Sequence, residues 1–150
     1  WLLLGLSTLP AQSQQYEMTD PCIKAYQCFM AMKINEGKSW LKKEISTNPS
    51  NSMPLILVNY EDYISLTFNE NPAEYKRRKP LLDQRLKALQ YTDKNSPYFL
   101  FGKALLHFQW CIIRSKHGDY WDAAWDFRRS YLLLAENRKK SRKNIDIGCQ

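Results

Sequence analysis

Helix-start signals recur along this sequence and constrain its fold more than any other feature. Asp20-Pro21, Asn71-Pro72 and Ser96-Pro97 each place a short polar side chain directly before a proline. Such a side chain accepts hydrogen bonds from the free backbone N–H groups of a helix start, and proline suits the first helical position because it lacks an N–H. Glu74 follows Asn71 by three residues, as in a capping box. Gly118-Asp119 closes one helix and caps the next, so these signals together predict consecutive helices.

Apolar residues at helical spacing follow these signals and predict six helices. The chain has only 5 glycines and no Asn-Gly or Asp-Gly turn, which argues against an all-β fold. Glu36-Gly37 should separate the first two helices, and Pro80 should kink or split the fourth, because proline removes a backbone donor. The helices are expected over residues of about 21–35, 38–47, 54–69, 72–91, 97–116 and 118–137.

The last two predicted helices carry broad apolar surfaces. Residues 97–116 are apolar around most of the circumference, so neighbours on several sides should bury that helix. The final helix has two apolar rows, which predict two packing partners. The rows consist of Tyr120, Ala124, Phe127, Tyr131 and Leu134, and of Trp121, Trp125 and Leu132. We therefore expect an all-α domain of three antiparallel helical hairpins stacked in series, with a compact helical bundle as the alternative.

The residues around the last turn resemble the second half of a tetratricopeptide repeat. Residues 118–120 supply the turn glycine and the aromatic residue two positions later, and Ala123, Phe127 and Ser130 supply the following small, aromatic and small positions. In the preceding half of that repeat, the motif positions fall on His107, Trp110, Cys111 and Arg114, of which only Trp110 and Cys111 fit. Residues 36–39 and 48–49 faintly resemble the same unit.

This resemblance implies a short tetratricopeptide-like solenoid of about six helices. It identifies the chain as a divergent relative of the exported, tetratricopeptide-like helical proteins of bacteria. In such a repeat the small residues allow close helix approach, and the aromatic residues fill the gap between hairpins. The aromatic residues of the last helix are therefore expected in the core.

The first residues are typical of the end of a secretory signal peptide. Residues 1–6 are apolar, and Ala11 and Ser13 are small residues before a cleavage site at Gln14. The alternative is the end of a buried N-terminal helix. We predict a signal-peptide remnant over 1–13, a helical domain over 14–140 and a C-terminal tail over 141–150, with the chain truncated at both ends. Elsewhere no apolar run approaches about 18 residues, so no membrane-spanning segment is expected.

The spacing of the cysteines and the distribution of charge limit which kinds of metal, redox and anion-binding site are expected. None of the four cysteines forms a C-x-x-C pair, Cys111 is expected in the core, and a bridge from Cys149 to an early cysteine stays open. The net charge of +7 comes from residues 76–79 and 138–143. We interpret these clusters as solvated surfaces, with an anionic partner as the alternative. An exported protein rarely meets nucleic acid, so none is expected as a partner.

No catalytic, cofactor-binding or metal-binding residues are predicted. The only histidines, His107 and His117, belong to no H-E-x-x-H motif, and the chain has neither a G-x-S-x-G motif nor a glycine-rich phosphate loop. His107 is expected to be solvated or lightly hydrogen-bonded. Asp119, Asp122 and Asp126 share one side of the last helix, where capping and surface pairing explain them.

The predicted function is therefore binding rather than catalysis. We expect a non-catalytic helical-repeat module of a periplasmic or cell-surface-associated bacterial protein, which binds a protein or peptide without a cofactor. The predicted partner-binding face consists of Tyr98, Lys103, His107 and Arg114, because the first helices of the hairpins normally line the groove. The alternatives are an accessory domain of a longer exported protein and a metal-dependent hydrolase on a helical scaffold.

Overall fold

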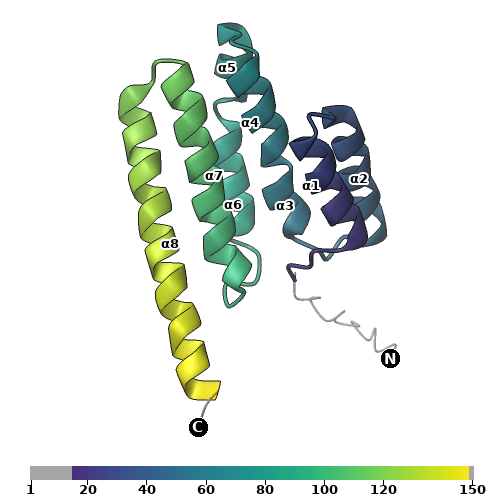
Figure 1. The fold of residues 1–150 in the computed structure, drawn as a ribbon, viewed down its shortest axis with the longest axis vertical. Coiled ribbons are helices and arrows are strands. Elements are labelled where there is room, and N and C mark those ends of the chain that lie inside the picture. Colours follow the sequence, from purple (N-terminus) through teal and green to yellow (C-terminus); the bar gives the residue numbers. More distant parts are fainter. Residues whose placement is uncertain (1–14, 149–150) are drawn as a thin grey trace, which may run out of the picture.

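The computed structural model describes residues 15–148, which fold into helices joined by short loops, with no strand in this range (Figure 1). The all-α prediction is confirmed. Eight helical segments replace the six predicted helices, because two of the predicted helices are each divided in two. The segments are α1 (Asp20–Met30), α2 (Ile34–Thr47), α3 (Met53–Leu57), α4 (Asn59–Phe68), α5 (Pro72–Arg78), α6 (Leu81–Leu89), α7 (Pro97–Lys116) and α8 (Tyr120–Gly148).

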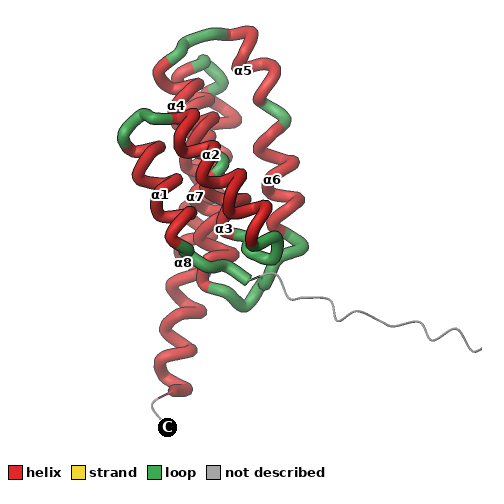
Figure 2. Tube along the Cα trace, turned by 90° about the vertical axis from the view of Figure 1, so that its right-hand side faces the viewer, coloured by secondary structure: helices red, strands yellow, loops and turns green. Residues whose placement is uncertain are grey.

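The helices follow one another across the molecule roughly in chain order, except that α1 lies between α2 and α3 (Figure 1). α1 packs against α2 at one end, α7 packs against α8 at the other, and α3 to α6 lie between them (Figures 1 and 2). Fifteen buried apolar residues form one core that reaches from α1 to α7. Trp110 and Leu106 of α7 are fully buried in this core, together with Phe29 of α1 and Leu66 of α4.

The boundary between α1 and α2 differs from the sequence prediction. α1 ends at Met30, and Met32 adopts a left-handed conformation with φ of 61°. Gly37, which we predicted to separate the two helices, lies inside α2 and is buried. A Cβ atom at this position would lie 2.8 Å from the Phe29 ring. The glycine therefore permits close contact between α1 and α2 and does not end a helix.

The later boundaries follow the sequence signals more closely. α7 has the predicted bounds, with the Ser96 side chain accepting a hydrogen bond from the N–H of Tyr98 at 3.2 Å. Pro80 separates α5 from α6, as expected for a residue without a backbone donor. α8 continues past the predicted end near residue 137, so residues 141–148 extend the helix and do not form a separate tail.

The aromatic side chains of α8 are exposed, and the expectation that they lie in the core is wrong. Trp121 is 85% exposed and Tyr131 is 66% exposed, whereas Ala123, Asp126 and Ser130 are buried. These three buried residues recur at helical spacing on one side of α8, and α7 is the helix against which α8 chiefly packs. α8 thus has one main packing partner, where the sequence predicted two.

Two further expectations concern the cysteines and the N-terminus. Cys22 is buried and Cys28 is partly buried, and within the described residues both are free thiols. Cys111, expected in the core, is only partly buried and is also a free thiol. Cys149 and the predicted signal-peptide remnant over 1–13 lie outside the described residues.

Candidate functional site

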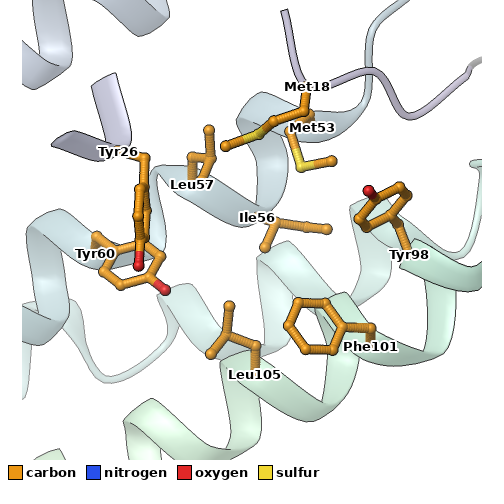
Figure 3. A pocket seen from close by; sticks show the side chains of 9 residues that line it. All are labelled: Met18, Tyr26, Met53, Ile56, Leu57, Tyr60, Tyr98, Phe101 and Leu105. Atoms are coloured by element: carbon orange, nitrogen blue, oxygen red, sulfur yellow. The ribbon is translucent and has the colours of Figure 1, made fainter. Parts of the chain in front are cut away.

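An apolar pocket of about 280 Å³ lies where α1, α3, α4 and α7 meet the segment that precedes α1 (Figure 3). Its walls contain methionine, tyrosine, phenylalanine, leucine and isoleucine, and no charged side chain. We call it the tyrosine–methionine pocket. It is lined by Met18, Tyr26, Met53, Ile56, Leu57, Tyr60, Tyr98, Phe101 and Leu105.

Backbone pairing fixes the N-terminal wall of this pocket. The N–H of Gln15 donates to the Ser50 carbonyl at 3.1 Å, and the N–H of Ser52 donates to the Gln15 carbonyl at 2.7 Å. The Asn51 side chain then bonds both the N–H and the carbonyl of Glu17, at 3.0 and 2.8 Å. These contacts hold the chain against the loop after α2 and place Met18 beside the pocket.

Aromatic packing positions two of the tyrosines. The Tyr26 and Tyr60 rings meet edge to face with centroids 5.5 Å apart, and Tyr60 also stacks on Phe29 at 6.3 Å. Burial, with smaller contributions from Tyr26 and Tyr63, raises the pKa of Tyr60 to about 12. The Tyr60 hydroxyl therefore stays neutral at physiological pH, and the pocket offers mainly apolar contact to a ligand.

Tyr98 is the one member of the predicted partner-binding face that lines this pocket. Its ring lies 6.2 Å from that of Tyr16, and it is 41% exposed. Lys103 lies elsewhere on α7, with its Nζ atom 5.2 Å from the centre of the Phe99 ring. Lys103 therefore does not line the pocket with Tyr98.

His107 and Arg114 are directed toward α8. His107 is only 5% exposed, so of the two expectations the solvated one is wrong, and the histidine is bonded instead. Its Nδ1 atom lies 2.8 Å from Oδ1 of Asp126, and Nη1 of Arg114 lies 2.8 Å from Oδ2 of the same carboxylate. Since the Asp126 side chain is fully buried, this cluster joins α7 to α8 and is not available to a partner as the structure stands.

The remaining pocket residues were not found by sequence reasoning. Helical spacing places Tyr26 and Tyr60 on apolar faces, but spacing alone does not separate a core residue from a pocket wall. Met18 and Met53 reach the pocket through the pairing of residues 15–17 with the loop at 50–52. That contact between two loops has no periodic signal in the sequence.

A second buried charge cluster joins α4, α5 and α6. Asp62, only 1% exposed, binds Arg78 at 2.6 Å and also pairs with Arg85. Arg78 binds Glu74 at 2.5 Å as well. One cation of the basic cluster at 76–79 is thus used in the interior, where opposite charges compensate one another.

A third cluster ties α5 to the start of α8. Lys79 donates to Asp119 at 2.6 Å and lies 3.3 Å from Asp122, and the Tyr75 hydroxyl also donates to Asp119. The hydrogen bond from Lys79, followed by the one from Tyr75, lowers the pKa of the Asp119 carboxyl. Tyr75 also stacks on His117, with ring centroids 4.3 Å apart.

These clusters pair acids with bases and link helices. In the described part of the chain, no group of three or more His, Cys, Asp or Glu side chains is placed to hold a metal ion. No helix within residues 15–148 has both the length and the apolar character needed to cross a membrane. No family model, curated protein or solved structure matches this chain.

Proposed function

We propose that this chain is a non-catalytic helical-repeat module, similar to tetratricopeptide repeats, that binds a protein or peptide in an exported bacterial protein. The observation that carries the proposal is the uncharged tyrosine–methionine pocket, which opens among helices from both ends of the chain. In a stacked-hairpin interpretation, α1 pairs with α2, α3 and α4 with α5 and α6, and α7 with α8. The pocket is then lined by the first members of all three pairs.

The lining favours a peptide or protein over a charged small molecule. A volume of about 280 Å³ is near the lower end for small-molecule sites, and it suits one or two apolar side chains of a larger ligand. Tyrosine and methionine are enriched at protein interfaces, where flexible methionine adapts to different side chains. Tyr26 and Tyr98 are each more than one third exposed, so a bound chain can reach them.

Selection from a displayed library of random peptides tests this proposal. We expect the purified chain to enrich peptides with a shared apolar anchor residue, which inserts into the pocket. Tyr98→Asp and Tyr26→Asp should each weaken the Kd of a selected peptide by more than about tenfold, because a charge would face an apolar ligand. Ile45→Asp, on an exposed part of α2 outside the pocket, is the matched control and should leave the Kd unchanged.

Two results would overturn the proposal: no enrichment of an apolar anchor, or equal weakening by the pocket variants and by Ile45→Asp. Circular dichroism of each variant separates loss of binding from loss of fold.

Export is a separate part of the proposal, supported by the apolar residues 1–6 and the small residues before Gln14. The protein expressed from its complete gene should be recovered outside the cytoplasm with Gln14 as its first residue. N-terminal sequencing measures this, and a cytoplasmic protein that retains residues 1–13 would contradict it.

A further inference from the structure

The uncovered apolar surface of α8 continues onto α7. A depression of about 170 Å³ lies between the two helices, and we call it the α7–α8 groove. It is lined by Phe101, Ala104, Leu105, Phe108, Ser130 and Leu134. Phe127 and Tyr131 precede Leu134 by seven and three residues, so they extend the groove along the same face of α8.

The side chains around the groove are unusually exposed for their type. Phe108 is 45% exposed, Phe127 is 57% exposed and Tyr131 is 66% exposed. Isolated exposed apolar residues are common, but a contiguous set on two adjacent helices is typical of an interaction site.

Contacts inside the molecule show that helices of this fold pack onto pairs of neighbouring helices. α3 contacts both α1 and α2, and α7 contacts both α4 and α6. In each case a helix lies against two helices that precede it in the chain. Among the described residues, no helix occupies the corresponding position against α7 and α8. A helix packed against both α7 and α8 would therefore repeat a contact that this fold already uses twice.

The charges on the two helices that form the groove indicate the chemistry of its occupant. α7 contains no Asp or Glu. On α8, Asp126 is buried against Arg114, and Asp122 lies 3.3 Å from Lys79. Glu136, the remaining acid before residue 143, is accompanied by Lys140 at 3.6 Å. Up to residue 142, the exposed cations of α8 are Arg128, Arg129, Arg138, Lys139, Lys140 and Arg142. Of these, Arg138 follows Leu134 by four residues and therefore lies on the groove face of α8.

We propose that the α7–α8 groove binds an amphipathic helix of a protein partner, with an apolar stripe for the groove and carboxylates for Arg138 and the other exposed cations of α8. The groove adjoins the tyrosine–methionine pocket and shares Phe101 and Leu105 with it, but its α8 wall does not line that pocket. The inference does not depend on what the pocket binds. A second copy of the chain fits less well, because it would bring the same excess of cations to the contact. A flat lipid surface reaches the exposed rings but not the depression between the helices.

A synthetic helical peptide provides the probe. It carries leucine at helical spacing on one face and glutamate on both flanks of that face, and its binding is measured by fluorescence anisotropy. We expect saturable binding that weakens as salt is raised. A matched peptide with lysine in place of each glutamate should bind at least about tenfold more weakly, because it meets the cations of α8.

Two substitutions of equal charge locate the site. Tyr131→Asp places a carboxylate in the groove and should weaken binding of the glutamate peptide by more than about tenfold. Trp121→Asp makes the same charge change on a more exposed ring of α8 that does not line the groove, and should change the Kd by less than about twofold. Both side chains are largely exposed, so both variants should fold. Tyr98→Asp, in the tyrosine–methionine pocket, should leave this binding unchanged.

Several outcomes would overturn the inference. They are no binding of the glutamate peptide, equal binding of the lysine peptide, and equal effects of Tyr131→Asp and Trp121→Asp. If the peptide does not bind, two further results would assign the groove to another occupant and overturn the inference. These are retention of the chain on phosphatidylglycerol vesicles and formation of a dimer, where Tyr131→Asp abolishes the retention or the dimer. Failure of the peptide selection at the tyrosine–methionine pocket would leave these results unaffected.

Discussion

The two buried sides of α7 are built from different chemistry. Toward α3, α4 and α6, α7 presents large apolar side chains such as Leu106 and Trp110, and Gln109 bonds the buried amide of Asn59 at 2.6 Å. Toward α8, it presents His107 and Arg114, which share a buried carboxylate. The first side gains its stability chiefly from apolar burial, whereas the second depends on compensated charges between closely packed small residues.

The difference between the two sides of α7 explains why the large side chains of α8 are exposed. Close packing through Ala123 and Ser130 brings α8 against α7 without using its large side chains. Those side chains, including Trp121 and Tyr131, are left for solvent or for a partner. The two sides of α7 should therefore respond differently to truncation, to loss of charge and to added volume.

The largest effect is expected from Trp110→Ala on the apolar side. The substitution empties the volume of a fully buried ring and removes the 3.0 Å hydrogen bond from its Nε1 atom to Asn59. We expect the free energy of unfolding to fall by about 4 kcal/mol in urea denaturation. Trp121→Ala removes the same ring from an exposed position and should change stability by less than about 0.5 kcal/mol. If the two variants lost similar amounts of stability, the Trp110 and Trp121 rings would not differ in burial as the structure shows.

Asp126→Ala tests the charged side. Its removal leaves Arg114 and His107 partly or fully buried without their shared carboxylate, so we expect a loss of about 3 kcal/mol in the same measurement. Asp122→Ala, at a half-exposed position on α8, should cost less than about 1 kcal/mol. If both substitutions cost equally little, the cluster around Asp126 does not hold α8 in place.

Alanine substitution should have different effects at Gly102, in the apolar interface between α3 and α7, and at Gly118, in the turn before α8. A Cβ atom at Gly102 would collide with the Ile56 side chain, so Gly102→Ala should cost about 2 kcal/mol in thermal unfolding. Gly118 has open space around it but a φ of 83°, so Gly118→Ala should cost about 1 kcal/mol through backbone strain alone. The reverse order would show that α3 and α7 can separate easily at this contact.

The sequence predicted the elements whose ends carry explicit signals. Ser96-Pro97 and Gly118 mark both ends of α7, and Pro80 divides α5 from α6. The role of Gly37 was not predictable in the same way, because it depends on the Phe29 ring of another helix. For the candidate site, the expectation that the first helices of hairpins line a groove named Tyr98, which lines the pocket. The loop contact that brings Met18 to the pocket leaves no periodic pattern.

The exposed side of α8 shows a second limit of periodicity. Two apolar rows predict two packing partners, but the pattern does not say which residues meet α7. In the structure the small and polar residues between the rows are buried, because the Asp126 carboxylate must reach Arg114 and His107. Charge pairing between α7 and α8 thus decides which side of α8 is covered, and hydrophobic spacing alone does not contain that information.

The smallest effect is expected at the partly exposed cluster that joins α5 to α8. Its hydrogen bonds from Lys79 and Tyr75 lower the pKa of Asp119 below its usual value of 3.8. A lowered folded-state pKa stabilises the protein above the unfolded-state pKa, and this contribution is lost as the pH falls through the folded value. Asp119→Asn should therefore lower the Tm slightly at neutral pH, by an amount equivalent to less than about 1 kcal/mol because solvent screens the pair.

The pH dependence of that difference distinguishes the ion pair from a general loss of packing. The Tm gap between the wild-type chain and Asp119→Asn should be constant from neutral pH down to about pH 4, and should close as the pH falls further. Asp83→Asn, at an exposed carboxylate of α6, controls for the general change in net charge. A gap that persists unchanged in acid would mean that the Asp119 carboxylate stabilises the turn through its shape rather than its charge. The contact between α5 and α8 would then resemble the apolar side of α7 more than the charged side.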